Sequence, residues 1–175
     1  DDTLTAGSSD TVDGADGADT LNGGASSQTL IGGNGDDVFT DAGGGSSMAG
    51  DAGDDTMTGG SGSDAILGGA DNDTIDAGGQ NDLSVDGGPG DDAIAGGGGN
   101  DILKGGAGAD VLHGGTEDDT LRGEAGPDQV FGDGGADTAT YSERQSFEAV
   151  VVKLDTGAGS DQDGGGPDLP GGIKD

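Results

Sequence analysis

Apolar residues recur along the chain at a spacing of nine. The spacing runs without a break from Leu21 to Ile75, and it returns from Ile94 to Val130 after one extra residue near Asp86. Most of their neighbours are polar, and side chains alternate between the two faces of a strand, so only the middle residue of each three-residue segment would point inward. The pattern predicts short strands centred on Leu21, Leu30, Phe39, Met48, Met57, Ile66, Ile75, Ile94, Leu103, Leu112, Leu121 and Val130.

The residues between these strands follow the same period. An aspartate stands two residues before most of the apolar positions, and glycine pairs such as Gly32-Gly33 open most units. Numbered from the first glycine, the unit reads G-G-x-G-x-D-x-U-x, where U is apolar; the apolar residue is missing at Ser84 and Ala139. Glycine permits the positive φ angles of a tight turn. A fixed period is typical of a solenoid, and a flexible acidic linker has no reason to keep one.

The composition favours cations as partners. The 175 residues include 36 acidic and five basic side chains, for a net charge of -31. Such a charge opposes compaction and excludes nucleic acids and anionic membranes as partners. The chain has no cysteine, which excludes disulfides and thiolate metal sites. No apolar run approaches the roughly 20 residues that span a bilayer, so no membrane insertion is expected.

This nonapeptide resembles the calcium-binding repeat of the repeats-in-toxin (RTX), or hemolysin-type, family over residues 1–140. The resemblance implies an all-β fold, a right-handed parallel β-roll, in which the first six residues of each unit form a turn and the last three a strand. Two units would make one coil. About 16 nonapeptides would then give about eight coils and a stack of roughly 38 Å, at about 4.8 Å per strand.

With two units per coil, the turns form two stacked columns, here named the first and second flank. The first flank would carry an aspartate at every level, at Asp2, Asp19, Asp37, Asp55, Asp73, Asp92, Asp110 and Asp128. The second would carry Asp10, Gln28, Ser46, Asp64, Asp82, Asp101, Asp119 and Asp137. Both substitutions, the shortened repeat near Ser8-Ser9 and the inserted residue fall on the second flank. We therefore expect one intact ion ladder and one that is interrupted in its N-terminal half.

Calcium prefers six to eight oxygen ligands from carboxylates and carbonyls, whereas magnesium demands a tight octahedron. The resemblance implies a site between each pair of stacked turns, where two aspartates share the ion. Carbonyls would come from the second and fourth positions of one turn and the first and third of the next. The side-chain ligands would be the first-flank aspartates with Asp64, Asp82, Asp101, Asp119 and Asp137. The carbonyls would be those of Gly33, Gly35, Gly50, Ala52, Gly69, Asp71, Gly87, Pro89, Gly88, Gly90, Gly105, Ala107, Gly106, Gly108, Gly123, Ala125, Gly97, Gly99, Gly114 and Thr116.

Stacked aspartate pairs number seven on the first flank and four on the second, which predicts about eleven calcium ions. Eleven divalent ions would change the formal charge from -31 to -9. We expect a largely disordered chain without calcium and cooperative folding with it, because the binding free energy becomes folding free energy. Non-glycine residues at the fourth position keep their carbonyl but are expected to strain the turn; they are Ser26, Asp71, Gln80 and Glu117.

The nonapeptides end near residue 140, and a different pattern follows. Residues 141–154 contain the only Tyr and an alternating segment from Val150 to Leu154, which predicts a half-buried strand that caps the last coil. Residues 155–175 are rich in Gly, Asp and Pro and are predicted to be loosely ordered or to begin a further segment. The chain starts within a repeat, which predicts a piece of a longer protein.

The sequence predicts a calcium-binding module rather than an enzyme. The lone His113 stands at an outward ninth position and belongs to no catalytic set. The resemblance implies a part of a larger secreted bacterial protein, exported by type I secretion, that folds on calcium outside the cell. Two alternatives stay open. One is a structural repeat of a surface layer, adhesin or extracellular fibre that self-associates through calcium, and the other is an accessory module of a secreted protease, lipase or epimerase.

Overall fold

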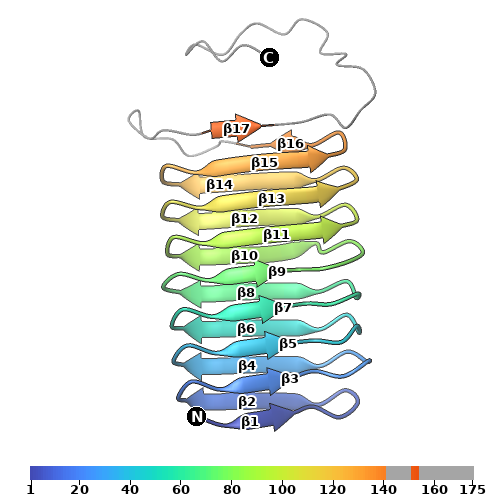
Figure 1. The fold of residues 1–175 in the computed structure, drawn as a ribbon, viewed down its shortest axis with the longest axis vertical. Helices are drawn as coiled ribbons and strands as arrows, with labels where there is room; N and C mark the ends of the chain where they lie inside the picture. The colour runs from blue at the N-terminus through green and yellow to red at the C-terminus, as the bar shows by residue number, and fades with distance from the viewer. Residues whose placement is uncertain (141–150, 154–175) are drawn as a thin grey trace, which may run out of the picture.

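Two parallel β-sheets wound from one chain make up the structure. The computed structural model describes residues 1–140 and 151–153. Consecutive strands alternate between sheet A, in the order β1-β3-β5-β7-β9-β11-β13-β15-β17, and sheet B, in the order β16-β14-β12-β10-β8-β6-β4-β2 (Figure 1). The bounds are Thr3–Thr5 (β1), Thr11–Asp16 (β2), Thr20–Asn22 (β3), Thr29–Asn34 (β4), Val38–Thr40 (β5), Ser47–Ala52 (β6), Thr56–Thr58 (β7), Ala65–Ala70 (β8), Thr74–Asp76 (β9), Ser84–Pro89 (β10), Ala93–Gly98 (β11), Ile102–Ala107 (β12), Val111–Thr116 (β13), Thr120–Ala125 (β14), Gln129–Gly134 (β15), Thr138–Ala139 (β16) and Val151–Lys153 (β17).

Each coil contains one strand of each sheet. Partners lie 18 residues apart along most of the roll, as in the pair of Leu21 with Phe39. The offset is 17 at the shortened repeat, where Thr3 pairs with Thr20, and 19 between β9 and β11. Every strand pair is parallel and each coil stacks on the one before it. The predicted parallel β-roll is therefore confirmed.

The core of residues 1–140 contains one inward side chain from each of the strands β1 to β16, as the alternation of strand side chains requires, together with Ala6 and Ala77. In sheet A the ladder runs through Leu4, Leu21, Phe39, Met57, Ile75, Ile94, Leu112 and Val130. In sheet B it runs through Val12, Leu30, Met48, Ile66, Val85, Leu103, Leu121 and Ala139. All are buried except Leu4, Val12 and Ala139, which pack partly buried against the others.

The extra residue of the chain lies at Leu83, immediately before β10. Val85, not Ser84, pairs with Ile66 and points into the core, while Leu83 is 62% exposed. The predictions that the apolar residue is missing at Ser84 and that the insertion lies near Asp86 are therefore wrong. A residue added inside a strand would turn every later side chain to the opposite face. Placed in the turn, it leaves the register of the core intact.

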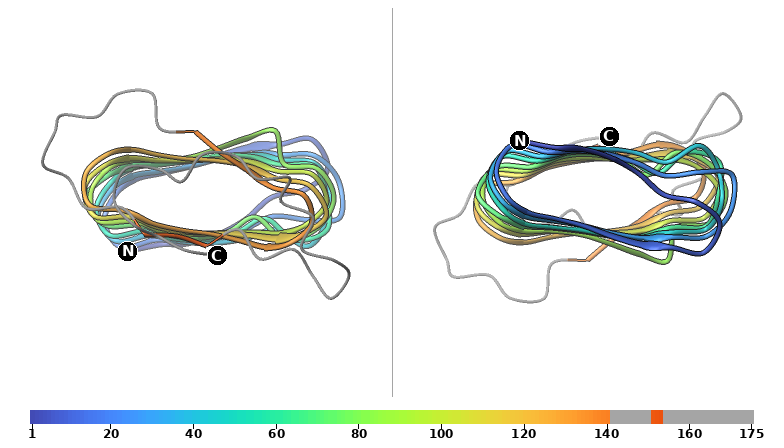
Figure 2. Two further views of the ribbon diagram at one scale, coloured as in Figure 1. Left: turned by 90° about the horizontal axis from the view of Figure 1, so that it is seen from above. Right: turned by 90° about the horizontal axis from the view of Figure 1, so that it is seen from below.

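The two flanks differ in regularity. Turns of the first flank follow the strands of sheet B, which are six residues long from β2 to β14; they lie on the left in Figure 1 and resemble one another. Turns of the second flank follow sheet A, whose strands have three residues up to β9 and six from β11 to β15. The second-flank turns vary in shape, and views along the roll show them spread at one end (Figure 2). The irregular turns include those in which the second ladder was predicted to be interrupted, and they continue to the turn between β9 and β10, where Asp82 was predicted to be a ligand.

Strand β17 adds a last strand to sheet A. It pairs in parallel with β15, from Gln129 with Val151 to Phe131 with Lys153. Its backbone lies where the sequence predicted a capping strand. The other residues of the predicted segment 141–154, and the segment 155–175, lie outside the described residues.

Candidate metal sites between the stacked turns

Each flank carries a column of side chains from the sixth position of its turns. On the first flank the aspartates from Asp19 to Asp128 are at most 2% exposed, whereas Asp2 is exposed. On the second flank the aspartates from Asp64 to Asp119 are at most 3% exposed, and Asp137 is partly buried. The structure thus brings the predicted side-chain ligands into two straight columns.

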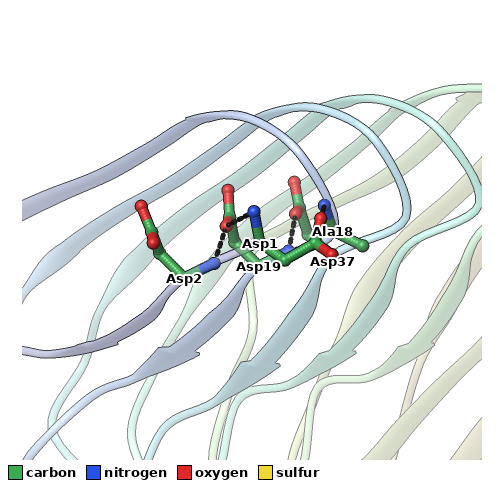
Figure 3. Close-up of polar contacts among 5 residues, drawn as sticks. All are labelled: Asp1, Asp2, Ala18, Asp19 and Asp37. Atoms are coloured by element: carbon green, nitrogen blue, oxygen red, sulfur yellow. Dashed lines mark hydrogen bonds and ion pairs between the residues drawn. The ribbon is translucent and has the colours of Figure 1, made fainter.

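One carboxylate oxygen of each aspartate is held by the turn below. Oδ1 of Asp37 accepts a hydrogen bond from the N–H of Asp19 at 2.7 Å, and Oδ1 of Asp92 accepts one from Asp73 at 2.8 Å. The same bond recurs along both flanks at 2.5 to 3.3 Å. Figure 3 shows the first rungs, from Asp2 to Asp37. Each rung ties two coils together and fixes the direction of the carboxylate.

The second carboxylate oxygen is buried and has no hydrogen-bond partner. Within the described part of the chain this holds for Oδ2 of Asp19, Asp37, Asp55, Asp64, Asp73, Asp82, Asp92, Asp101, Asp110, Asp119 and Asp137. Leaving a buried polar atom unsatisfied costs about 1–3 kcal/mol, and more for a charged group. The same unsatisfied atom at the same place in successive coils indicates a repeated binding feature, because a packing fault would not recur.

Backbone carbonyls of the first turn position lie beside these oxygens. A Cβ placed on Gly14 would lie 2.6 Å from Asp19 Oδ2 and 2.7 Å from the carbonyl oxygen of Gly32 in the turn above. Glycine therefore leaves a space that both oxygens face. The same arrangement brings in four of the predicted carbonyls, those of Gly50, Gly87, Gly105 and Gly114.

Carbonyls of the third position are tied along the stack. On the first flank they accept hydrogen bonds of 2.7 to 3.1 Å from the fourth residue of the turn below, and among them are the predicted ligands Ala52, Pro89, Ala107 and Ala125. A carbonyl has two lone pairs, so each keeps one for another partner. Among the described residues, no group of three or more acidic or histidine side chains converges to hold a metal. An ion between the turns would thus depend on carboxylate pairs completed by carbonyls, an oxygen set that suits calcium.

Comparison with protein families identifies the repeat that forms these columns. The family model described as the RTX calcium-binding nonapeptide repeat matches four times, at residues 4–39, 49–83, 86–120 and 113–140. The chain belongs to the RTX calcium-binding repeat family. Comparison with curated proteins and with solved structures gives no match. The RTX repeat is a structural calcium-binding unit, and the four matches include turns of both flanks.

Burial raises the pKa of the aspartates in the RTX turns. Loss of water around the carboxylate is the largest cause; the hydrogen bond from the turn below opposes it, and neighbouring acidic groups add to it at most positions. The pKa rises to about 6 in Asp55 and Asp64, and to about 7 in Asp73, Asp82, Asp110 and Asp119. It is also raised in Asp37, Asp92, Asp101 and Asp137. Without a cation, the fold therefore opposes ionisation of its own columns.

The metal-free roll is expected to gain stability as the pH falls. Aspartates of an unfolded chain have a pKa of about 3.9. Because the folded values are higher, the folded state binds more protons; this stabilisation is complete below about pH 4 and is lost as the pH rises through 6 and 7. Circular dichroism of the chain, freed of calcium on a chelating resin, should show more β-structure at about pH 4.5 than at pH 7.5. An unchanged signal would contradict the raised pKa values.

Where the second flank is interrupted, the side chains of the turns form hydrogen bonds, in contrast to the unsatisfied Oδ2 atoms of the aspartate columns. Gln28 accepts a hydrogen bond from Gly24 N–H at 3.0 Å and donates one to the carbonyl of Gly7 at 3.2 Å. Ser46 Oγ donates to Oδ2 of Asp41 at 2.8 Å, and Asp41 stands at the first turn position in place of glycine. These side chains satisfy one another, so this part of the RTX roll does not present the same site. Sequence reasoning missed Asp41, whose signal was an acidic residue in place of the first glycine.

A second ladder, also missed, lies at the exposed fifth position. Asp54 N–H donates to Asp36 Oδ1 at 3.1 Å, Asp91 N–H to Asn72 Oδ1 at 2.8 Å, and Ala109 N–H to Asp91 Oδ1 at 2.8 Å. In these bonds the upper turn donates and the lower turn accepts, which is the reverse of the buried ladder. Stacked turns therefore exchange hydrogen bonds in both directions. On the second flank the acceptors are Asn81, Asn100 and Asp118. The signal in the sequence was the Asp-Asp or Asn-Asp doublet that recurs with the period.

Non-glycine residues occupy the left-handed region of the backbone in several turns. Of the four residues predicted to strain a turn, Asp71, Gln80 and Glu117 have φ angles of 80°, 69° and 74°, whereas Ser26 is not among the residues with positive φ. The left-handed conformation costs such a residue roughly 1–2 kcal/mol. Second-position residues do the same, at Ala15, Asp51, Glu124 and Asp133. Stacking of the RTX coils therefore overrides the local preference of these residues.

The outward faces of the sheets carry features separate from the turns. His113 stacks on Phe131 with ring centroids 4.6 Å apart, and its Nδ1 lies 2.8 Å from Oδ2 of Asp133. Lys104 forms an ion pair with Asp86 at 3.0 Å. These are exposed or half-buried contacts between neighbouring coils. In the part of the chain that the structure describes, no helix is long and apolar enough to cross a membrane.

Proposed function

We propose that this RTX roll is a folding module, which calcium converts from a disordered chain into a rigid stack. The observation that carries the proposal is the column of buried Oδ2 atoms without a partner, many of which lie beside a backbone carbonyl of the next turn. Two such oxygens and the carbonyls of two stacked turns give the oxygen set that calcium prefers. The ligands would be the aspartates and carbonyls predicted from the sequence.

Charge supports a requirement for calcium. The chain has a net charge of -31, and the roll brings its carboxylates into two columns with one level per coil. An uncompensated buried charge destabilises a fold by several kcal/mol, at roughly 3–5 kcal/mol for a broken buried pair. The core supplies little more than one inward side chain per strand. Cation binding would offset the repulsion and link each coil to the next.

The proposal extends to the compartment in which the module folds. Calcium sites of extracellular modules have dissociation constants of about 10⁻⁴–10⁻³ M, well above the cytosolic calcium concentration. A module in this range would stay unfolded in the cell during synthesis and fold after export, as part of a larger secreted protein. Folding on export would keep a highly acidic chain extended until it meets calcium.

Isothermal titration calorimetry at pH 7.5 tests the proposal. Calcium should bind with a steep isotherm and a number of ions close to the number of stacked aspartate pairs. Magnesium at the same concentration should bind weakly, because it demands a tight octahedron and loses water reluctantly. Binding that does not distinguish the two ions, or no binding of calcium, would contradict the proposed function.

A further inference from the structure

The first position of each RTX turn points into the roll. The apolar eighth residue of a unit faces inward and the ninth outward, so the next residue faces inward again. The burial pattern agrees, since Gly32, Gly59 and Gly96 are all buried. None of the first-position glycines has a positive φ angle. No left-handed conformation therefore requires glycine at this position, and glycine is needed there only for the space it leaves.

Ala77 is an exception at this position. Its N–H donates to the carbonyl of Ala95 at 2.8 Å, as the N–H of Gly59 donates to Asp76 at 2.8 Å, so the two residues occupy equivalent places. Ala77 is 0% exposed, and its methyl group is therefore inside the roll. The turn it opens ends at Asp82 of the second flank.

The equivalent glycines show what this methyl group meets. A Cβ on Gly96 would lie 2.6 Å from the carbonyl oxygen of Gly114 in the turn above, and next to Asp101 Oδ2 of its own turn. By the same register, the methyl of Ala77 faces Asp82 Oδ2 and the carbonyl of Gly96. That space lies between turns 77–82 and 96–101, where Asp82 and Asp101 would share an ion.

The two turns are not spread apart to make room. The N–H of Gly98 donates to the carbonyl of Gly78 at 2.9 Å, and Ala77 is tied to Ala95 at the usual length. Asp41 also replaces the first-position glycine in a second-flank turn. Its side chain enters the turn, where it is 3% exposed and accepts a hydrogen bond from Ser46. A side chain at the first position thus occupies the interior of the turn.

We propose that the methyl group of Ala77 closes the interval between Asp82 and Asp101 to calcium, which leaves a gap in the ion ladder of the second flank. The proposal rests on the calcium-binding function proposed above. Asp82 keeps an ion partner in the interval below, which it shares with Asp64. The second flank then holds one ion fewer than its aspartate pairs indicate, and glycine at the first position decides which intervals are filled.

Native mass spectrometry of the full chain in calcium tests this proposal, because it counts bound ions one by one. Ala77→Gly should bind one more calcium than the wild type. Gly96→Ala is the matched control: it adds the same methyl group one turn further on and should bind one calcium fewer. Non-specific adducts cancel in the comparison, since the variants differ by one methyl group.

Equal ion counts for the wild type and Ala77→Gly would overturn the proposal while leaving the function intact. A wild-type chain that binds no calcium would instead refute the proposed function itself. Thermal unfolding in saturating calcium provides a second readout. Ala77→Gly should raise the melting temperature in calcium, although replacing alanine by glycine normally lowers stability by making the unfolded chain more flexible. A lower melting temperature together with an unchanged count would indicate that Ala77 serves packing alone.

Discussion

Removal of calcium at pH 7.5 is expected to abolish the β-roll. A chelator in excess should convert the far-ultraviolet circular dichroism spectrum from β-structure to that of a disordered chain, and added calcium should restore it. The reason is that the buried carboxylates repel one another and that, in most of those the structure describes, Oδ2 has no hydrogen-bond donor. Neighbouring coils share each site, so the return should be steep in calcium concentration.

The control for this prediction separates specific binding from salt screening. Sodium chloride at matched ionic strength also weakens repulsion between exposed charges, over a Debye length of about 8 Å near physiological ionic strength. It should not restore the roll, because a monovalent ion does not replace calcium at the buried carboxylates. Recovery in sodium chloride alone would mean that screening of the net charge, and not ligation, controls folding.

Asp92→Asn, which removes one buried charge, is expected to destabilise the calcium-bound roll strongly. Asp92 belongs to two intervals, with Asp73 below and Asp110 above. At calcium a hundredfold above the dissociation constant, one site contributes about 2.7 kcal/mol, so the loss of two destabilises the roll by about 5 kcal/mol. Asparagine keeps the oxygen that accepts the Asp73 N–H, so the loss reports on charge rather than on the backbone ladder.

Asp91→Asn is the matched control, one residue away. Asp91 is exposed and accepts a hydrogen bond from Ala109, which asparagine can also do. Urea unfolding in saturating calcium should place this variant within about 0.5 kcal/mol of the wild type. In chelator at neutral pH the stabilities of Asp92→Asn and the wild type should be reversed. The variant lacks one buried charge and should retain more structure than the wild type. Equal losses for the two variants would argue against a buried ion at Asp92.

The fold followed from the period because each physical requirement repeats with it. One inward residue in nine, an aspartate two residues earlier and a glycine pair before that leave few arrangements other than a stack of turns and short strands. The irregular half of the second flank was also anticipated, from Gln28 and Ser46. The inward ladder of Leu21, Leu30 and their successors is buried as the alternation requires.

The errors and omissions lie where the period does not decide the geometry. A nine-residue pattern with one extra residue does not say where the extra residue goes, and burial of Val85 places it at Leu83, in the turn before β10. The fifth-position ladder depends on which side of the turn faces the next coil, and a sequence does not show this. The roles of Asp41 and Ala77 follow only once the first position of the turn is known to point inward.

Anomalous scattering from crystals grown in calcium tests the central claim most directly. The account predicts a peak between Asp37 and Asp55, within reach of both carboxylates and of glycine carbonyls of their turns, and a peak at each further level of the first flank. Ordered coils with no peak between Asp37 and Asp55 would contradict it, because the roll would then be held together without shared metal.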